Sequence, residues 1–188
     1  MRFIFISVSI LLFFAQVKAA EIGLHSTSTT ADIIVSGEIT PGDANKVHDL
    51  IDRIDGDKKI HRFIIHSPGG NVTEAISIGS LLRSYGFTVF EPVGVTCISA
   101  CIFAIAGGRS RILMGKVALH HPYLPHVLES HPVARQIQSE GKQAMLEYMK
   151  KMGVQETIVD AMYSLQDPSE IKYLSTAELQ AYKLATDQ

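Results

Sequence analysis

Short apolar runs alternate along the chain with longer segments in which apolar residues recur every three or four positions. The short runs predict strands, because three to four consecutive apolar residues bounded by turn residues are typical of a buried sheet. One of them, Phe63-Ile64-Ile65, is apolar throughout, as in a parallel sheet that is covered on both faces. The predicted strands cover residues 33–35, 63–65, 87–90, 112–114 and 117–119.

Helical spacing follows most of these strands. The first helix is expected to have Thr40 as its N-cap and Pro41 at its first position, and the second to have Asn71 as its N-cap with Glu74 as the capping partner. Further helices are predicted over residues 100–106, about 132–152, 155–165 and 175–183. The alternation predicts an α/β sheet with right-handed crossovers, a site at the carboxyl ends of the strands, and a helical C-terminal part.

The first nineteen residues have the features of a secretory signal. Arg2 forms a short basic start, residues 3–17 are an apolar run too short and too poorly flanked for a membrane span, and Val17-Lys18-Ala19 fits the small-residue cleavage pattern. We therefore expect a periplasmic or secreted protein with one domain over residues 20–188. Membrane attachment is expected only if residues 1–19 stay uncleaved.

Composition changes this picture in two ways. Removal of Arg2 and Lys18 leaves 15 basic residues against 19 acidic ones, a net charge of −4, and no basic stripe with interleaved aromatic residues occurs. Nucleic acid is therefore excluded as an expected partner.

The two cysteines, Cys97 and Cys101, flank Ser99. In an oxidising compartment they are expected either to form a disulfide, with Cys97 just before a helix, or to pack as two small apolar side chains.

Three segments together predict acyl-transfer chemistry. Ser67-Pro68-Gly69-Gly70 follows a strand and offers backbone N–H groups without a Cβ nearby, Ser99 opens an apolar helix, and His120 ends a later strand. A serine hydroxyl needs a base within hydrogen-bond reach, and a developing oxyanion needs aimed N–H donors. Each motif alone has a plain structural reading: a helix cap for the serine, a strand-to-helix turn for the glycines, and a satisfied strand-end histidine.

The order of these motifs resembles the proteolytic subunit of Clp peptidases in the Clp/crotonase-like superfamily, and most closely its exported branch with a Ser-Ala-Cys signature, here Ser99-Ala100-Cys101. The resemblance implies repeated β-β-α/β-α units. It implies Ser99 as the nucleophile, His120 as the base, the N–H groups of Gly70 and Ala100 as the oxyanion hole, and substrate contacts at Gly69 and His121. It also implies a homo-oligomer, a peptide or unfolded protein as substrate, and no cofactor.

The acid of the triad departs from the family pattern. Counting back from Leu174 to the family's aspartate position gives Ile171, so the orienting acid is expected to be Glu170, with Asp167 as the alternative, or to be absent. A serine and histidine without the acid still catalyse, but more slowly, because the acid fixes the imidazole tautomer.

Two other functions compete with an exported serine hydrolase. A protein that kept the fold but lost the chemistry would bind an extended peptide in the same groove. A metal site is the minor alternative, because His120, His121, His126 and His131 lie within twelve residues. That segment has no His-x-x-x-His spacing and no nearby acid or thiol at a suitable spacing, so no metal ligand is assigned.

Overall fold

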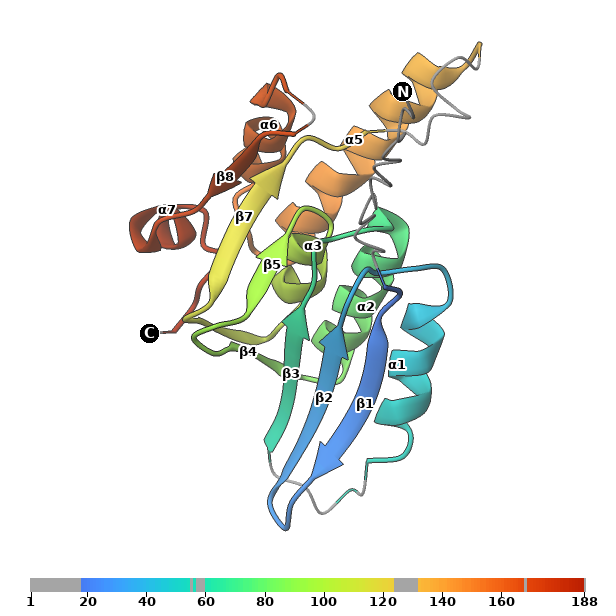
Figure 1. Cartoon of the computed structure of the whole chain (residues 1–188), viewed down its shortest axis with the longest axis vertical. Coiled ribbons are helices and arrows are strands. Elements are labelled where there is room, and N and C mark those ends of the chain that lie inside the picture. The colour runs from blue at the N-terminus through green and yellow to red at the C-terminus, as the bar shows by residue number, and fades with distance from the viewer. Residues whose placement is uncertain (1–17, 55, 57–59, 124–131, 168, 188) are drawn as a thin grey trace, which may run out of the picture.

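The computed structural model describes residues 18–54, 56, 60–123, 132–167 and 169–187. Strands and helices alternate as far as His120, and helices dominate afterwards (Figure 1). The strands are β1 Glu21–Ser26, β2 Thr30–Ser36, β3 Ile60–His66, β4 Thr88–Glu91, β5 Thr96–Ile98, β6 Ser110–Leu113, β7 Lys116–His120 and β8 Ile171–Tyr173. The helices are α1 Asp43–Ile51, α2 Val72–Ser84, α3 Cys101–Ala106, α5 Ala134–Lys151, α6 Thr157–Ser164 and α7 Thr176–Ala181.

The strands form two sheets that meet near the predicted site. The larger sheet has the order β1-β2-β3-β4-β6, in which only the β1–β2 pair is antiparallel. The smaller sheet has the order β5-β7-β8, with β5 and β7 parallel and β8 antiparallel. An isolated parallel bridge between Ser67 and Cys97 joins the chain just after β3 to β5. The predicted α/β class is therefore confirmed, and the carboxyl ends of β3, β5 and β7 lie together.

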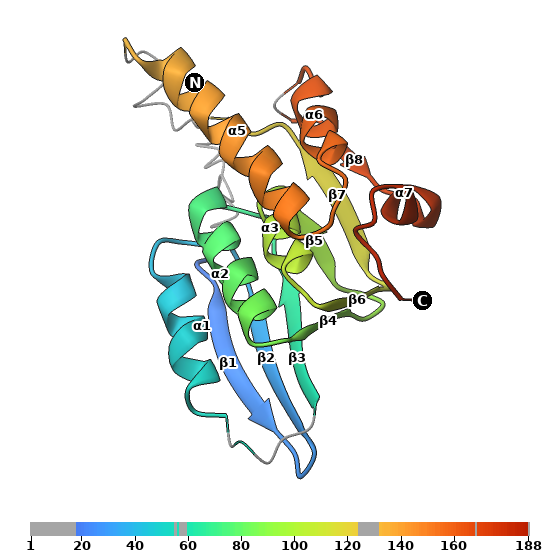
Figure 2. The ribbon, with the colours of Figure 1, turned by 180° about the vertical axis from the view of Figure 1, so that it is seen from behind.

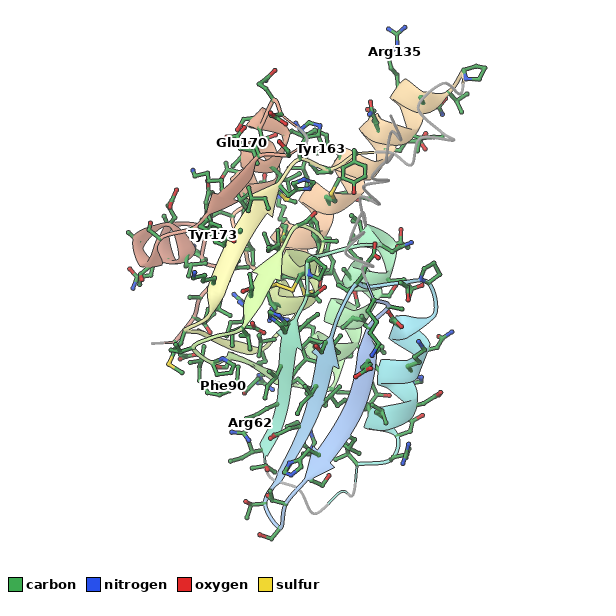
Figure 3. All side chains as sticks on the ribbon, in the orientation of Figure 1. Arg62, Phe90, Arg135, Tyr163, Glu170 and Tyr173 are labelled. Atoms are coloured by element: carbon green, nitrogen blue, oxygen red, sulfur yellow. A yellow bond between two sulfur atoms is a disulfide. The ribbon has the colours of Figure 1, made fainter. Side chains whose placement is uncertain are left out.

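The helices α1 and α2 cover one face of the larger sheet (Figures 1 and 2). Ile33 and Val35 point to this covered face and are fully buried, whereas Ile34 between them is 42% exposed. On the uncovered face the Arg62 guanidinium pairs with Asp32 and lies 5.7 Å from the centre of the Phe90 ring (Figure 3). The expectation of a sheet covered on both faces was therefore wrong, because apolar side chains on the open face are only half-buried.

The short helix α3 is enclosed by the core, and all six of its residues are buried. The Tyr148 hydroxyl of α5 donates to the Phe103 carbonyl at 2.7 Å. A Cβ on Gly79 of α2 would collide with this Tyr148 hydroxyl and would lie 2.5 Å from the same carbonyl oxygen, so glycine is needed for α2 to pack this closely. These contacts hold α3, and with it Ala100 at its start, against the longer helices α2 and α5.

The N-cap predicted for α2 is present, whereas the one predicted for α1 is not. Asn71 caps α2 as predicted, because its side chain accepts the Glu74 N–H, but the Glu74 carboxylate accepts the Ala44 N–H instead of returning to Asn71. Thr40 as the N-cap of α1 was wrong. Gly42 occupies that position with φ of 94°, and the Asp43 carboxylate accepts both the N–H and the hydroxyl of Thr40.

The strand β1 and the three-residue strands β5 and β8 were not predicted. Each has a mixed pattern that sequence periodicity does not single out; β8, for example, has the sequence Ile-Lys-Tyr and is exposed at all three positions. Such strands are specified by the neighbour with which they pair.

Most of the predicted leader, residues 1–17, lies outside the described residues. The described chain starts at Lys18 and pairs at once with Glu38: the Lys18 carbonyl accepts the Glu38 N–H, and the Ala20 N–H donates to the Glu38 carbonyl. Within the part of the chain that the structure describes, no helix combines the length and apolarity that a membrane crossing requires.

Candidate active site

A cavity of about 760 Å³ opens where the ends of β3, β5 and β7 converge. Ser99 and His120 both line it, together with Gly69, Gly70 and His121. The rest of its wall comes from the loop after β2, the first turns of α2, the segment after β7, and the helices α5 and α6. These lining residues are Glu38, Ile39, Thr40, Pro41, Pro68, Asn71, Val72, Thr73, Ile76, Pro122, Tyr123, Ile137, Gln138, Gly141, Ala144, Met145 and Tyr163.

The glycine turn after β3 is held against the loop after β2. The Ile39 N–H donates to the Gly69 carbonyl, and the Asn71 N–H donates to the Ile39 carbonyl, both at 2.8 Å. Gly70 between them has φ of 124°, and a Cβ there would lie 2.2 Å from the Ile39 carbonyl oxygen. Only glycine fits this position, because both the backbone angle and the space exclude a side chain.

Ser99 lies in a second turn, between β5 and α3, and has φ of 56°. Left-handed backbone costs a residue with a Cβ about 1–3 kcal/mol and persists where the surroundings impose it. Two hydrogen bonds fix this turn: the Ser99 N–H donates to the Ala118 carbonyl of β7, and the Ser99 carbonyl accepts the Ile102 N–H. The sequence suggested a helix cap for Ser99, but the cap position of α3 is Ala100.

The two turns touch each other. A Cβ on Gly69 would lie 2.8 Å from the Ser99 Cβ and 3.1 Å from the Ala100 nitrogen. Gly69 therefore permits the glycine turn to approach the serine turn closely. Within the described part of the chain, the backbone hydrogen bonds include none donated by Gly70 or Ala100. These are the two N–H groups that the sequence predicts for an oxyanion hole.

A disulfide joins Cys97 and Cys101 across the serine turn, with the two Cα atoms 5.4 Å apart. Cys97 lies in β5 and Cys101 is the first residue of α3, and both are fully buried. The bond therefore connects a strand to a helix, which is the arrangement that makes a spacing of four residues compatible with a disulfide.

His120 is the last residue of β7, two residues beyond the carbonyl that binds the Ser99 N–H. The Tyr123 ring meets the His120 ring edge-on, with 5.7 Å between the ring centres. His121 meets the Tyr163 ring of α6 at 5.4 Å, and its Nδ1 atom is buried with no hydrogen-bond partner among the described residues. Both histidines therefore face the cavity, each against one tyrosine.

The candidate acids lie near β8. In the β7–β8 ladder the residue opposite His120 is Ile171, and Glu170 precedes it at the start of the strand (Figure 3). Asp167 accepts the N–H and the hydroxyl of Ser169, and these hydrogen bonds lower the pKa of its carboxyl group. This register does not identify the orienting acid, so the role of Glu170 or Asp167 stays a prediction.

The Clp protease family model matches residues 21–185, which include every predicted site residue. The chain belongs to the Clp protease family. Among solved structures, a mutant of the 1510-N membrane-bound stomatin-specific protease is similar in fold, with a TM-score of 0.62 and 14% identity over 86% of this chain and 79% of that chain. No curated protein matches the sequence. The predicted superfamily is thus confirmed, and the fold is that of a serine peptidase.

One buried acid lies beside the strand that leads into the glycine turn and was not singled out from the sequence. Glu91 ends β4, is fully buried, and accepts the Ile65 N–H of β3 at 3.0 Å. Its second carboxyl oxygen has no partner among the described residues, and burial raises the pKa of Glu91 to about 8. Glu91 therefore supports the strand that leads into Ser67 and the glycine turn.

The metal alternative receives no support from the described residues. They contain no group of three or more histidine, cysteine, aspartate or glutamate side chains arranged to hold a metal ion. Two of the four histidines of that hypothesis, His126 and His131, lie outside the described residues.

Several residues that line the cavity were not predicted as site residues from the sequence. Tyr163 and Met145 come from the helical C-terminal part, and Ile39 comes from the loop after β2. Nothing in the spacing of Tyr163 or Met145 sets them apart from ordinary core residues. Tyr123 could have been included, because it follows His120-His121-Pro122 directly.

Proposed function

We propose that this protein is an exported serine peptidase in which Ser99 forms an acyl-enzyme. The observation that carries the proposal is the contact between the two turns: Gly69 abuts Ser99 closely enough that a single Cβ would collide with the Ser99 Cβ at 2.8 Å. Ser99, His120 and Gly70 thus line one cavity, and the N–H groups of Gly70 and Ala100 make no described backbone hydrogen bond. Membership of the Clp protease family supports the same chemistry.

The chemistry follows from these groups. The Ser99 hydroxyl attacks the carbonyl carbon of a peptide bond, and His120 accepts its proton and passes it to the leaving amine. Water then attacks the ester, with His120 as base again, and releases the acid product and free Ser99. The N–H groups of Gly70 and Ala100 stabilise the oxyanion in both steps, where one such donor contributes about 3 kcal/mol to the transition state.

The left-handed turn gives Ser99 a clear role. Its N–H donates to the Ala118 carbonyl and its carbonyl accepts the Ile102 N–H, so hydrogen bonds anchor the backbone on both sides of the side chain. A strained, over-determined residue at a cavity is typical of functional sites. Glu170 or Asp167 is proposed to orient His120; if neither does, catalysis is slower, because the uncharged Ile171 opposite His120 cannot stabilise the imidazolium.

The substrate that we propose is a peptide or an unfolded protein segment. Much of the cavity wall is apolar, with Ile76, Ile137, Met145 and Tyr163 among the lining residues. Such a wall favours an apolar side chain next to the scissile bond. No cofactor enters the proposed reaction.

We also propose export, removal of residues 1–19, and a single domain that starts at Ala20. The Cys97–Cys101 disulfide supports export, because structural disulfides persist in oxidising compartments. A homo-oligomer is proposed from the family relationship. The half-exposed apolar residues Ile34 and Ile60 on the uncovered sheet face are compatible with contacts between copies.

Hydrolysis of a fluorescein-labelled unfolded protein tests the function. Ser99→Ala is expected to abolish the activity, and His120→Ala to lower kcat by at least about 100-fold. His48→Ala on the distant helix α1 is the matched control and should keep the wild-type rate. Absence of hydrolysis by the folded wild-type protein, combined with binding of the same unfolded substrate, would instead support a peptide-binding protein without chemistry.

A further inference from the structure

The Cys97–Cys101 disulfide encloses only three residues, Ile98, Ser99 and Ala100. The middle one is the proposed nucleophile, and the third carries one of the two N–H groups proposed for the oxyanion. Its two ends are fixed in different elements, Cys97 in β5 and Cys101 in α3, and both are fully buried. The bond therefore sets the separation of strand and helix at the one point where the reacting groups lie.

Backbone strain at Ser99 makes this separation important. Its N–H is anchored on the Ala118 carbonyl, so the φ angle decides where the Cβ and the hydroxyl point. A φ of 56° is unfavourable for a residue with a Cβ, and a freed turn would relax towards negative φ. Such a rotation would turn the hydroxyl away from its present direction.

Neighbouring groups give the turn little other covalent or steric restraint. Gly69, the residue that abuts it, has no side chain that could block the relaxation. The hydrogen bonds to Ala118 and Ile102 hold backbone atoms on either side of the serine Cα, but they leave rotation between them possible. The disulfide is the only covalent link across the turn.

We infer that the Cys97–Cys101 disulfide is a positioning device for Ser99, so that rapid acylation requires the oxidised pair. The inference rests on the proposed function. It predicts that loss of the bond lowers kcat and the rate of acylation, while KM for the substrate changes little, because the cavity walls that bind substrate come from other elements.

The experiment compares the rate at which a fluorophosphonate probe labels wild-type protein and the Cys97→Ala/Cys101→Ala double variant. The double variant is expected to label at least about tenfold more slowly. The matched control is Leu179→Ala, which removes a buried side chain of α7 and keeps the disulfide. It should lose thermal stability but label at the wild-type rate.

Reduction of the wild-type protein provides a second test that needs no substitution. Excess dithiothreitol attacks one sulfur, a mixed disulfide forms, and its second thiol closes the ring of oxidised dithiothreitol, which leaves two protein thiols. After thiol counting confirms two free thiols, the labelling rate should fall as in the double variant, and reoxidation should restore it.

Each outcome separates the two proposals. Wild-type protein that is folded and oxidised but never labelled contradicts the proposed function itself. Equal labelling of oxidised and reduced protein, or of wild type and the double variant, contradicts the positioning role and leaves the proposed function standing. A double variant that labels slowly only in proportion to a loss of folded protein, as judged against Leu179→Ala, also contradicts the positioning role.

Discussion

The two turns at the centre of the molecule occupy equivalent places, each between a parallel strand and the helix that follows it. After β3 the turn contains Gly69 and Gly70, with φ of 109° and 124°. After β5 the corresponding turn contains Ser99, with φ of 56°. Both turns contain residues with positive φ, but only in the second turn does such a residue have a side chain.

The first turn must allow a close approach of two backbones, whereas the second must also present a reactive side chain. Glycine adopts positive φ without steric cost, so the first turn brings N–H groups close to a neighbour at no strain. The second turn must present a hydroxyl, and it keeps a serine where the backbone disfavours one. The Cys97–Cys101 disulfide spans the second turn, whereas the first is held by hydrogen bonds to Ile39.

The largest effect is expected at the glycine turn. Gly70→Ala places a Cβ 2.2 Å from a backbone oxygen and forces a side chain into φ of 124°, so we expect a loss of on the order of 3–5 kcal/mol in the free energy of unfolding. Gly42→Ala is the control, because Gly42 has φ of 94° but no atom within 4 Å of an added Cβ. It should cost about 1–2 kcal/mol.

Urea unfolding of both variants measures the difference. Equal losses at the two glycines would show that the backbone angle alone matters and that the close approach to Ile39 does not.

A smaller effect is expected from the acid that supports the strand before this turn. The pKa of Glu91 is raised to about 8, whereas in the unfolded chain it stays near the usual value of 4.5. Between these pH values the folded state keeps a proton that the unfolded state has lost, so stability falls as pH rises. Glu91→Gln keeps an acceptor for the Ile65 N–H without this titration.

We therefore expect Glu91→Gln to gain stability relative to wild type by about 1.4 kcal/mol per pH unit, or roughly 3 kcal/mol between pH 5 and pH 7. Carboxyl groups with lowered pKa values, such as that of Glu178, titrate below this window. Thermal melts of both proteins at pH 5, 6 and 7 check the slope. A difference that does not change with pH would contradict the buried, protonated state.

The smallest effect concerns the serine turn itself. Ser99→Gly should be more stable than Ser99→Ala by about 1 kcal/mol, because glycine accepts φ of 56° and alanine does not. At Ser77, within α2, the order should be reversed, since glycine is less favourable than alanine inside a helix by about 1 kcal/mol. Denaturation midpoints of the four variants measure both signs. If the alanine variant were the more stable one at position 99 as well, Ser99 would not be strained.

The sequence predicts the parts of this site that depend on local pattern. Ser67 to Gly70 follows an apolar strand, and the strand-end place of His120 follows from the run before it. The left-handed backbone of Ser99 has no local signal, because the Ala118 carbonyl that accepts its N–H and the Gly69 backbone beside it come from other segments of the chain.

Long-range contributions were not predictable for the same reason. Tyr163 meets His121 only because α6 packs beside β7, and Glu91 is buried only because β4 ends beside Ile65. The pairing of β8 with β7 places Ile171 opposite His120, and a three-residue exposed strand has too weak a pattern to be recognised.

Mapping the fluorophosphonate adduct by mass spectrometry tests the central claim most directly. We expect a single adduct on the Ser99 hydroxyl of the folded protein, lost in Ser99→Ala and formed much more slowly in His120→Ala. An adduct on another serine, such as Ser67, or no adduct on protein shown to be folded and oxidised, would contradict it.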